Sequence, residues 1–220
     1  MTHKLEPTVS ALVPDWSRES KRWYEWHPSR SLLASIRSYQ RHRASRYPQS
    51  IALRYVAVLR HRFWSAVTGA DIPLNCQIEG GLLLPHPNGV VIHPDAVIGP
   101  NCLLFQQTTL GGGPLGAPTL CGHVDVGAGA KILGAVRLGS HSKVGANAVV
   151  LQDVPEGATC VGIPGRVVTQ SGPTAAVHRG ASAHHPEDAA GPCAQPHHQG
   201  AFDGNAPSFR GFAGLRVWRH

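Results

Sequence analysis

The chain has 220 residues, of which 42% are hydrophobic, and a formal net charge of +7. This length and composition are typical of a globular protein with one domain or two small ones. No apolar run reaches the roughly 20 residues of a membrane-spanning helix, and the polar start is unlike a signal peptide. The 5 cysteines are scattered and form no Cys-x-x-Cys pair. This argues against a disulfide framework or a zinc ribbon, and it predicts a reducing, cytoplasmic location.

The positive charge is concentrated in the first third of the chain. Residues 1–70 contain twelve Lys or Arg and only four Asp or Glu. Such a segment can be attracted to nucleic acid, to anionic lipid or to a phosphorylated cofactor. The simpler interpretation is a solvated helix face rich in arginine. We adopt the simpler interpretation, and no nucleic-acid partner is expected.

Two segments precede the main repeat of the chain. Residues 1–15 lack periodicity and contain two prolines, which predicts a flexible arm. Residues 16–70 have apolar residues at helical spacing and are predicted to form a basic α-helical segment. Within it, Ser29 is a candidate N-cap for a first helix, and Pro48 ends that helix.

A second helix is predicted from Ile51 to about Thr68, with Gly69 as its C-cap. Its predicted apolar face contains Leu53, Val56, Leu59, Phe63 and Val67. A basic amphipathic helix can lie on a membrane. Packing against its own protein is the commoner arrangement and is the one expected here.

From residue 71 to residue 169 an aliphatic residue returns every six positions. The three in-phase series are Ile72, Ile78 and Leu84; Ile92, Ile98, Leu104 and Leu110; and Leu120, Val126, Ile132, Leu138, Val144 and Val150. A six-residue unit with one inward aliphatic side chain predicts a parallel β-helix, in which three units make a triangular coil. The segment is long enough for about five coils.

Beyond the repeat, residues 170–220 are dominated by Ala, Gly, Pro, Ser and His. Too few aliphatic residues are present to offset the entropy lost on ordering, so a low-complexity, disordered tail is predicted. Its histidines could bind metal adventitiously. The simpler interpretation is a tail without a metal site.

The six-residue repeat slips twice, at His86–Gly89 and at Gly111–Gly116. A packed repeat that admits irregular backbone usually does so for a functional site. Asp71 precedes His86 by close to one coil, so the two residues can lie on neighbouring coils. An imidazole whose tautomer is held by a carboxylate can remove a proton from a hydroxyl group. Taken alone, the pair is equally compatible with a surface histidine beside a turn.

Several short motifs place this pattern in a known context. They are Asp71-Ile72-Pro73, Leu84-Pro85-His86-Pro87-Asn88-Gly89, Gln107-Thr108-Thr109-Leu110-Gly111-Gly112, Val126-Gly127-Ala128-Gly129-Ala130-Lys131-Ile132-Leu133-Gly134 and Val161-Gly162-Ile163-Pro164-Gly165-Arg166. In order and spacing they resemble the serine O-acetyltransferase family. The resemblance implies a left-handed parallel β-helix and a homotrimer with active sites between subunits, a hexamer being the larger alternative. It also implies acetyl-CoA as the donor and no metal.

The same resemblance implies roles for individual residues. His86 matches the general base of the family and Asp71 its orienting carboxylate. Gly112, Ala128 and Ala146 match positions along the cofactor groove, and Arg166 is a candidate for phosphate contact. The implied reaction is acetyl transfer to L-serine, which gives O-acetylserine for cysteine biosynthesis.

The sequence departs from the family pattern around the acceptor. Pro85 stands where the family usually has an acidic residue, and Gly116 and Ala117 stand where it has an Arg-His pair. This favours an altered acceptor site, and an O-acetyltransferase acting on a sugar hydroxyl in surface-polysaccharide biosynthesis is the alternative.

Two more distant alternatives use the same repeat. A zinc enzyme of the γ-carbonic-anhydrase type requires three histidine ligands, but His86, His93, His123 and His141 do not have the His-x4-His spacing of that family. A non-catalytic scaffold would direct His86 to solvent, away from any groove.

Overall fold

The structure is a computed structural model that describes residues 9–22, 24–45 and 47–168. All of them belong to the first of two units in the chain, Met1–Arg179. The second unit, Gly180–His220, lies outside the described residues. The predictions made for the tail at 170–220 and for the first eight residues of the arm therefore fall outside them as well.

Three helical elements precede the strands: the 3-10 helix η1 (Trp16–Arg18), α1 (Pro28–His42) and α2 (Pro48–Thr68). Both α-helices begin with proline, whose fixed φ and missing N–H suit the first helical turn. The predicted Ser29 cap is therefore wrong, because α1 begins one residue earlier and His27 is its N-cap. Gly69 ends α2 in the left-handed region, at φ 65°, which confirms the predicted C-cap.

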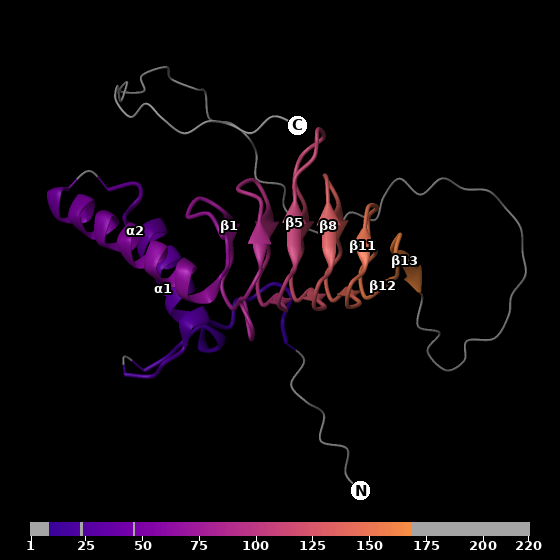
Figure 1. Cartoon of the computed structure of the whole chain (residues 1–220), viewed down its shortest axis with the longest axis horizontal. Coiled ribbons are helices and arrows are strands. Elements are labelled where there is room, and N and C mark those ends of the chain that lie inside the picture. Colours follow the sequence, from indigo (N-terminus) through magenta and orange to yellow (C-terminus); the bar gives the residue numbers. More distant parts are fainter. Residues whose placement is uncertain (1–8, 23, 46, 169–220) are drawn as a thin grey trace, which may run out of the picture. The chain divides into compact units, whose positions relative to one another are not determined.

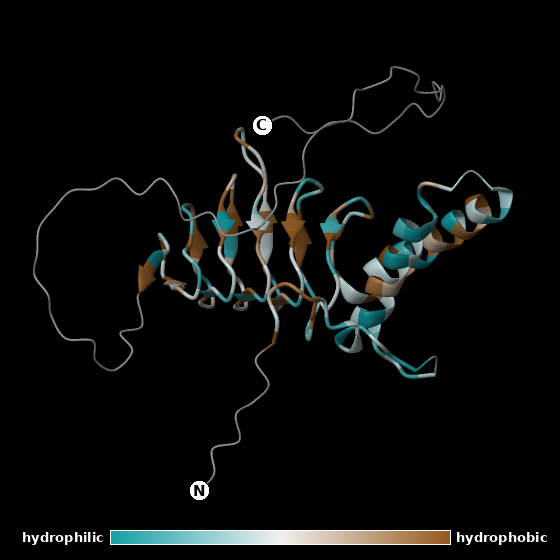
Figure 2. Cartoon of the chain, turned by 180° about the vertical axis from the view of Figure 1, so that it is seen from behind, coloured by the Kyte–Doolittle hydropathy of each residue, from teal (hydrophilic) through white to brown (hydrophobic). Residues whose placement is uncertain are grey.

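Helix α2 packs against α1, but not through the predicted apolar face. Its buried residues are Ala57 and Thr68, and Trp64 packs against the core beside them. The five residues of the predicted face are instead between 43% and 67% exposed. The expectation that this face packs on the protein itself is wrong. Figure 2 shows apolar and polar stretches alternating along the helices.

Residues from Gln77 onward form a β-helix of three sheets (Figure 1). One sheet contains β1 (Gln77–Ile78), β3 (Val97–Ile98), β6 (Thr119–Leu120) and β9 (Arg137–Leu138). The second contains β4 (Leu103–Leu104), β7 (Asp125–Val126), β10 (Lys143–Val144), β12 (Thr159–Val161) and β13 (Arg166–Val168). The third, here called sheet A, contains β2 (Val91–Ile92), β5 (Thr109–Gly111), β8 (Lys131–Leu133) and β11 (Val149–Val150).

All strand pairs are parallel except the last, in which β13 folds back antiparallel on β12. Partners in sheet A lie 18 residues apart, as in the pairing of Ile92 with Leu110, so one coil contains three six-residue units. Each of the thirteen aliphatic residues in the three series is at most 6% exposed. The predicted fold class, a left-handed parallel β-helix of about five coils preceded by a short α-helical segment, is confirmed.

Residues 9–15, assigned from sequence to a flexible arm, lie against the β-helix at Asn101. The fully buried Asn101 side chain donates to the carbonyls of Ser10 and Val13 at 2.7 and 2.8 Å. Its Oδ1 accepts the Asp15 N–H at 2.8 Å. Because these bonds satisfy a buried amide, they fix the arm at one corner of the coils.

Candidate functional site

His86 lies in a loop that lengthens one coil by two residues. Asp71 pairs with Val91, 20 residues later, whereas Val91 pairs with Thr109 after 18 residues. Leu84 and Val90 are buried and hold the two ends of the loop. Pro85 and His86 between them are exposed. The imidazole is therefore presented at the surface by a loop with anchored ends.

Hydrogen bonds tie this loop to the coils on both sides. The Gly89 N–H donates to the carbonyl of Gly69, and the Gln107 N–H donates to that of Asn88, both at 2.9 Å. The Val90 N–H closes the turn by donating to the Pro87 carbonyl at 3.1 Å. With its backbone paired in this way, the loop holds His86 at a defined edge of the β-helix.

Asp71 lies on the neighbouring coil, as its spacing from His86 predicts. Its N–H donates to the Val90 carbonyl at 2.8 Å, and its carbonyl accepts the Ile92 N–H at 2.9 Å. Both side chains are exposed. Between these two described residues the structure has no hydrogen bond or ion pair, and the role of Asp71 in orienting His86 remains a prediction.

Ala128 and Ala146 follow the same edge on later coils. The Asn147 N–H donates to the Ala128 carbonyl at 2.8 Å, and the Gly129 N–H donates to that of Gln106 at 2.9 Å. This is the pattern that joins Gln107 to Asn88 one coil earlier. The structure therefore brings His86, Ala128 and Ala146 to one edge, and the small alanine side chains leave that edge open.

Gly112 begins the second irregular loop, Gly111–Gly116, which follows β5. The loop closes on itself through hydrogen bonds between Gly113 and Gly116, at 2.7 and 3.1 Å. In Figure 1 it extends beyond the neighbouring coils above the β5 label. A Cβ on Gly112 would lie 2.6 Å from His93 Nε2, and a Cβ on Gly111 would lie 2.8 Å from Leu133 Cδ2. Both glycines are thus required by contacts within the chain itself, whatever ligand approaches them.

His93 is a feature that sequence reasoning considered only as a zinc ligand. It follows β2, and its half-buried ring lies against Gly112. The Asp95 N–H donates to Nδ1 of His93 at 3.2 Å. In the neutral ring the proton therefore resides on Nε2, which faces the glycine-rich loop. No periodicity or motif in the sequence indicates this contact, because it depends on the path of the loop.

Arg166 lies apart from the other predicted residues. It is exposed in β13 and pairs with Val161 of β12. Along its sheet, β12 is separated from the level of Leu83 by four coil-to-coil steps, through β4, β7 and β10. At about 4.8 Å per step this is roughly 19 Å. Arg166 and His86 could therefore contact opposite ends of one elongated ligand, but not a single small group.

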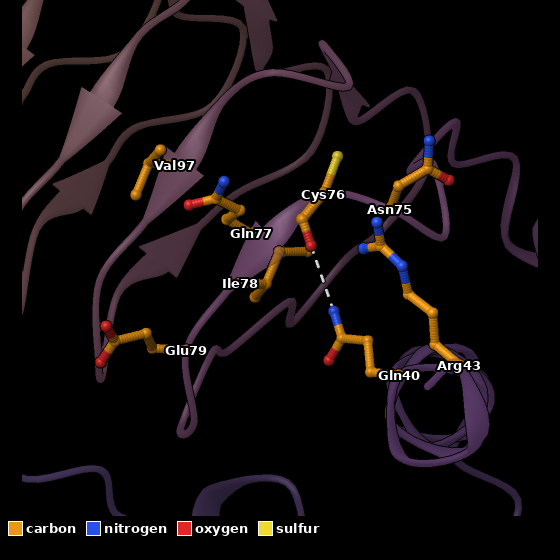
Figure 3. A pocket seen from close by; sticks show the side chains of 8 residues that line it. All are labelled: Gln40, Arg43, Asn75, Cys76, Gln77, Ile78, Glu79 and Val97. Atoms are coloured by element: carbon orange, nitrogen blue, oxygen red, sulfur yellow. Dashed lines mark hydrogen bonds between the residues drawn. The ribbon is translucent and has the colours of Figure 1, made fainter. Parts of the chain in front are cut away.

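A pocket is present elsewhere, between the end of α1 and β1 (Figure 3). It is lined by Gln40, Arg43, Asn75, Cys76, Gln77, Ile78, Glu79 and Val97, none of which is a predicted site residue. Gln40 Nε2 donates to the Cys76 carbonyl at 3.1 Å. Burial, with smaller effects from Asp95 and Asp71, raises the pKa of the Cys76 thiol to about 12. This thiol is therefore not a nucleophile at neutral pH.

His123 and His141, two of the four histidines weighed as zinc ligands, stack on adjacent coils. Their Nδ1 atoms are 2.8 Å apart, and both residues have positive φ. Burial lowers the pKa of His123 below its ordinary value. Within residues 9–22, 24–45 and 47–168 no group of three or more His, Cys, Asp or Glu side chains could hold a metal ion.

Known proteins share both the sequence and the fold of this chain. The serine acetyltransferase of Synechococcus elongatus is 39% identical over 135 residues, which cover 60% of this chain and 55% of the relative. The serine acetyltransferase of Mycobacterium tuberculosis is 38% identical over 137 residues, 60% of each chain. The matched region belongs to the serine O-acetyltransferase family. No protein-family model matches the chain.

Solved serine acetyltransferases superpose on the same fold. A soybean serine acetyltransferase complexed with serine aligns with a TM-score of 0.56 and 36% identity, over 65% of this chain and 58% of that chain. A serine acetyltransferase complexed with CoA aligns with a TM-score of 0.55 and 33% identity, over the same shares. This chain spans less than two thirds of the length of the serine acetyltransferases it matches.

Proposed function

We propose that this protein is an acetyl-CoA-dependent O-acetyltransferase that transfers acetyl groups to L-serine, giving O-acetylserine for cysteine biosynthesis. The observation that carries the proposal is the lengthened coil at Leu84–Gly89. It presents an exposed histidine beside Asp71, at the edge that Ala128 and Ala146 leave open. The sequence identity with serine acetyltransferases supports the same reaction.

In the proposed mechanism, His86 acts as the general base. Its free ring nitrogen accepts the proton of the acceptor hydroxyl as the hydroxyl oxygen attacks the thioester carbonyl carbon. The carbon–sulfur bond breaks, and the departing thiolate of CoA takes the proton back from the imidazolium. The carboxylate of Asp71 stabilises the imidazolium while it exists. Backbone N–H groups of the glycine-rich loop stabilise negative charge on the carbonyl oxygen.

The donor is proposed to lie along the edge of the β-helix. Gly112, Ala128 and Ala146 would contact the pantetheine arm, because their small side chains admit it without steric conflict. The guanidinium of Arg166 would contact a phosphate of CoA. A separation of roughly 19 Å between the levels of Arg166 and His86 suits a donor that is bound in an extended form.

We propose a homotrimer in which each active site lies between two subunits, with a hexamer as the larger alternative. In the single chain, the described pocket lies away from His86, and the predicted residues line an open edge. Sheet A and the strand ends beside it expose apolar side chains, with Val91 40%, Leu133 38% and Leu151 58% exposed. A neighbouring subunit would bury them and close the edge over the donor.

The cytoplasm is the proposed location. Cys76, Cys102 and Cys160 keep free, buried thiols. Burial raises the pKa of the Cys102 thiol to about 12. Such thiols are inert and compatible with a reducing compartment.

The second candidate function is O-acetylation of a sugar hydroxyl in surface-polysaccharide biosynthesis. The specific observation that favours it is the chemistry of the acceptor end. Pro85 precedes the proposed base, and the loop Gly111–Gly116 contains no charged side chain. A serine carboxylate and ammonium normally require charged partners, whereas a neutral sugar does not.

Release of thiol from acetyl-CoA distinguishes these functions. We expect L-serine to stimulate release and His86→Ala to lower the rate by about 10²–10⁴-fold. The matched control is His27→Ala, which removes an exposed histidine of the helical segment. Release stimulated by a sugar and not by L-serine would select the second function. An unchanged rate in His86→Ala would exclude His86 as the base.

A further inference from the structure

Helix α2 presents a continuous apolar stripe that no other part of the described chain covers. Its central residues, Val56, Leu59 and Phe63, are 50%, 67% and 56% exposed, and Val67 continues the stripe at 43%. Ala52 and Ala66 are also exposed, and they extend the same stripe at helical spacing. The opposite side of α2 is held by α1 through Ala57, Trp64 and Thr68. The helix is therefore a preformed ridge with its apolar side outward.

Two arginines border this stripe. Successive residues in an α-helix are rotated by about 100°, so Arg60 and Arg62 fall on opposite flanks of the line through Ala52, Leu59 and Phe63. Both side chains are exposed. The stretch from residue 26 to residue 70 contains eight Arg and no Asp or Glu. The surface thus combines apolar side chains with a single sign of charge.

Charge decides which occupant suits this surface. A second copy of the chain would place Arg60 and Arg62 near their own equivalents, with no acidic residue in the helices to pair with them. A nucleic acid would attract the arginines but would leave Val56, Leu59 and Val67 without apolar partners. The interface of an anionic bilayer accepts both groups, because acyl chains take the stripe while lipid headgroups pair with the flanking arginines.

We propose that the outer face of α2 docks the protein on the surface of an anionic lipid bilayer. The helix lies in the plane of the interface and does not cross it, and neither described helix has the length and hydropathy needed to span a bilayer. This docking is independent of the proposed acetyl transfer, since no residue of α2 is placed in the catalytic or donor site.

Vesicle flotation of the full-length protein tests the proposal. We expect binding to vesicles of phosphatidylglycerol mixed with phosphatidylcholine, weakening as salt is raised, and little binding to phosphatidylcholine alone. Leu59→Glu should reduce the partition coefficient by at least about tenfold, since it places a charge at the centre of the stripe. Leu12→Glu is its matched control, because Leu12 is 71% exposed but lies outside α2.

The arginines are tested separately. Arg60→Gln and Arg62→Gln should each lower binding by about fivefold, which corresponds to about 1 kcal/mol per cation near the membrane surface. Arg54→Gln is the control, since Arg54 is half-buried on the opposite side of the helix and should change binding less.

Three results would overturn the proposal. The first is equal binding to both vesicle types or to neither. The second is unchanged binding in Leu59→Glu, which would assign membrane binding to another part of the chain. The third is a change of oligomeric state in Leu59→Glu without lipid, which would show that a second copy covers the stripe. Tighter binding to duplex DNA than to anionic vesicles would also reject a membrane partner in favour of nucleic acid.

Discussion

Replacing Gly112 by Ala tests whether His93 shapes the glycine-rich loop. The added methyl group would lie 2.6, 2.7 and 3.0 Å from Nε2, Cδ2 and Cε1 of His93. Relaxed contacts between heavy atoms are about 3.5–4.0 Å, so the ring must move by roughly an ångström. Overpacking of this kind costs about 1–3 kcal/mol. The His93 side chain is 37% exposed and can swing outward, losing the bond from Asp95, so we expect about 1–2 kcal/mol.

A double-mutant cycle in urea isolates this contact. The free energy of unfolding is measured for the wild type, Gly112→Ala, His93→Ala and the double variant at one protein concentration. Once the imidazole is removed, the methyl group at position 112 meets nothing, so its cost should fall below about 0.5 kcal/mol. The coupling energy between the two positions should then be about 1 kcal/mol.

Gly113→Ala is the matched control for this cycle. Its methyl group would meet only the backbone of Gly134, at 3.3 Å, and should cost less than the methyl group at Gly112. If Gly112→Ala costs the same with and without the His93 ring, the proposed contact does not exist. Under the proposed function, Gly112→Ala should also raise the KM for acetyl-CoA, because displaced loop backbone narrows the donor groove.

Three further predictions concern stability. Leu120→Ala, at a fully buried position of the third aliphatic series, should destabilise the β-helix by about 2–5 kcal/mol in urea unfolding, whereas Leu115→Ala, at a 91% exposed position, should change stability little. Asn101→Gly keeps the backbone free to adopt φ 60° but removes three hydrogen bonds, so residues 10–15 should become sensitive to limited proteolysis; Asn147→Gly, another position with positive φ, is the control, and equal protection in both variants would contradict the anchoring role of Asn101. Because burial lowers the pKa of His123, the unfolded chain binds more protons than the folded chain below about pH 6.5, and stability is lost as pH falls through that window. His123→Asn, which tolerates positive φ, should flatten the dependence of Tm on pH between about 7.5 and 5, and an unchanged slope would show that another group causes it.

The two helices show where sequence periodicity reaches its limit. The 3.6-residue period correctly predicts α2 and its glycine C-cap, because both depend on local backbone geometry. It also predicts that the stripe with Leu59 and Phe63 is buried, which is wrong. A helix with apolar residues on both sides can pack by either side, and Trp64 and Ala57 are the residues that meet α1 and the core. The choice is made by the partner surface, which no local pattern contains.

The sequence by itself determined the β-helix, since one inward aliphatic residue in every six dictates the coil and each of those residues is buried. It also located the two loops and placed His86 and Asp71 on neighbouring coils, because their spacing is close to one coil. Only the tertiary structure decided that His93 lies against Gly112, that Asn101 holds residues 10–15, and that the apolar stripe of α2 faces outward. These contacts join segments whose distance in sequence follows no repeat. They arise from the path of loops and helices across the coils, and packing between such segments is settled only when the whole chain is folded.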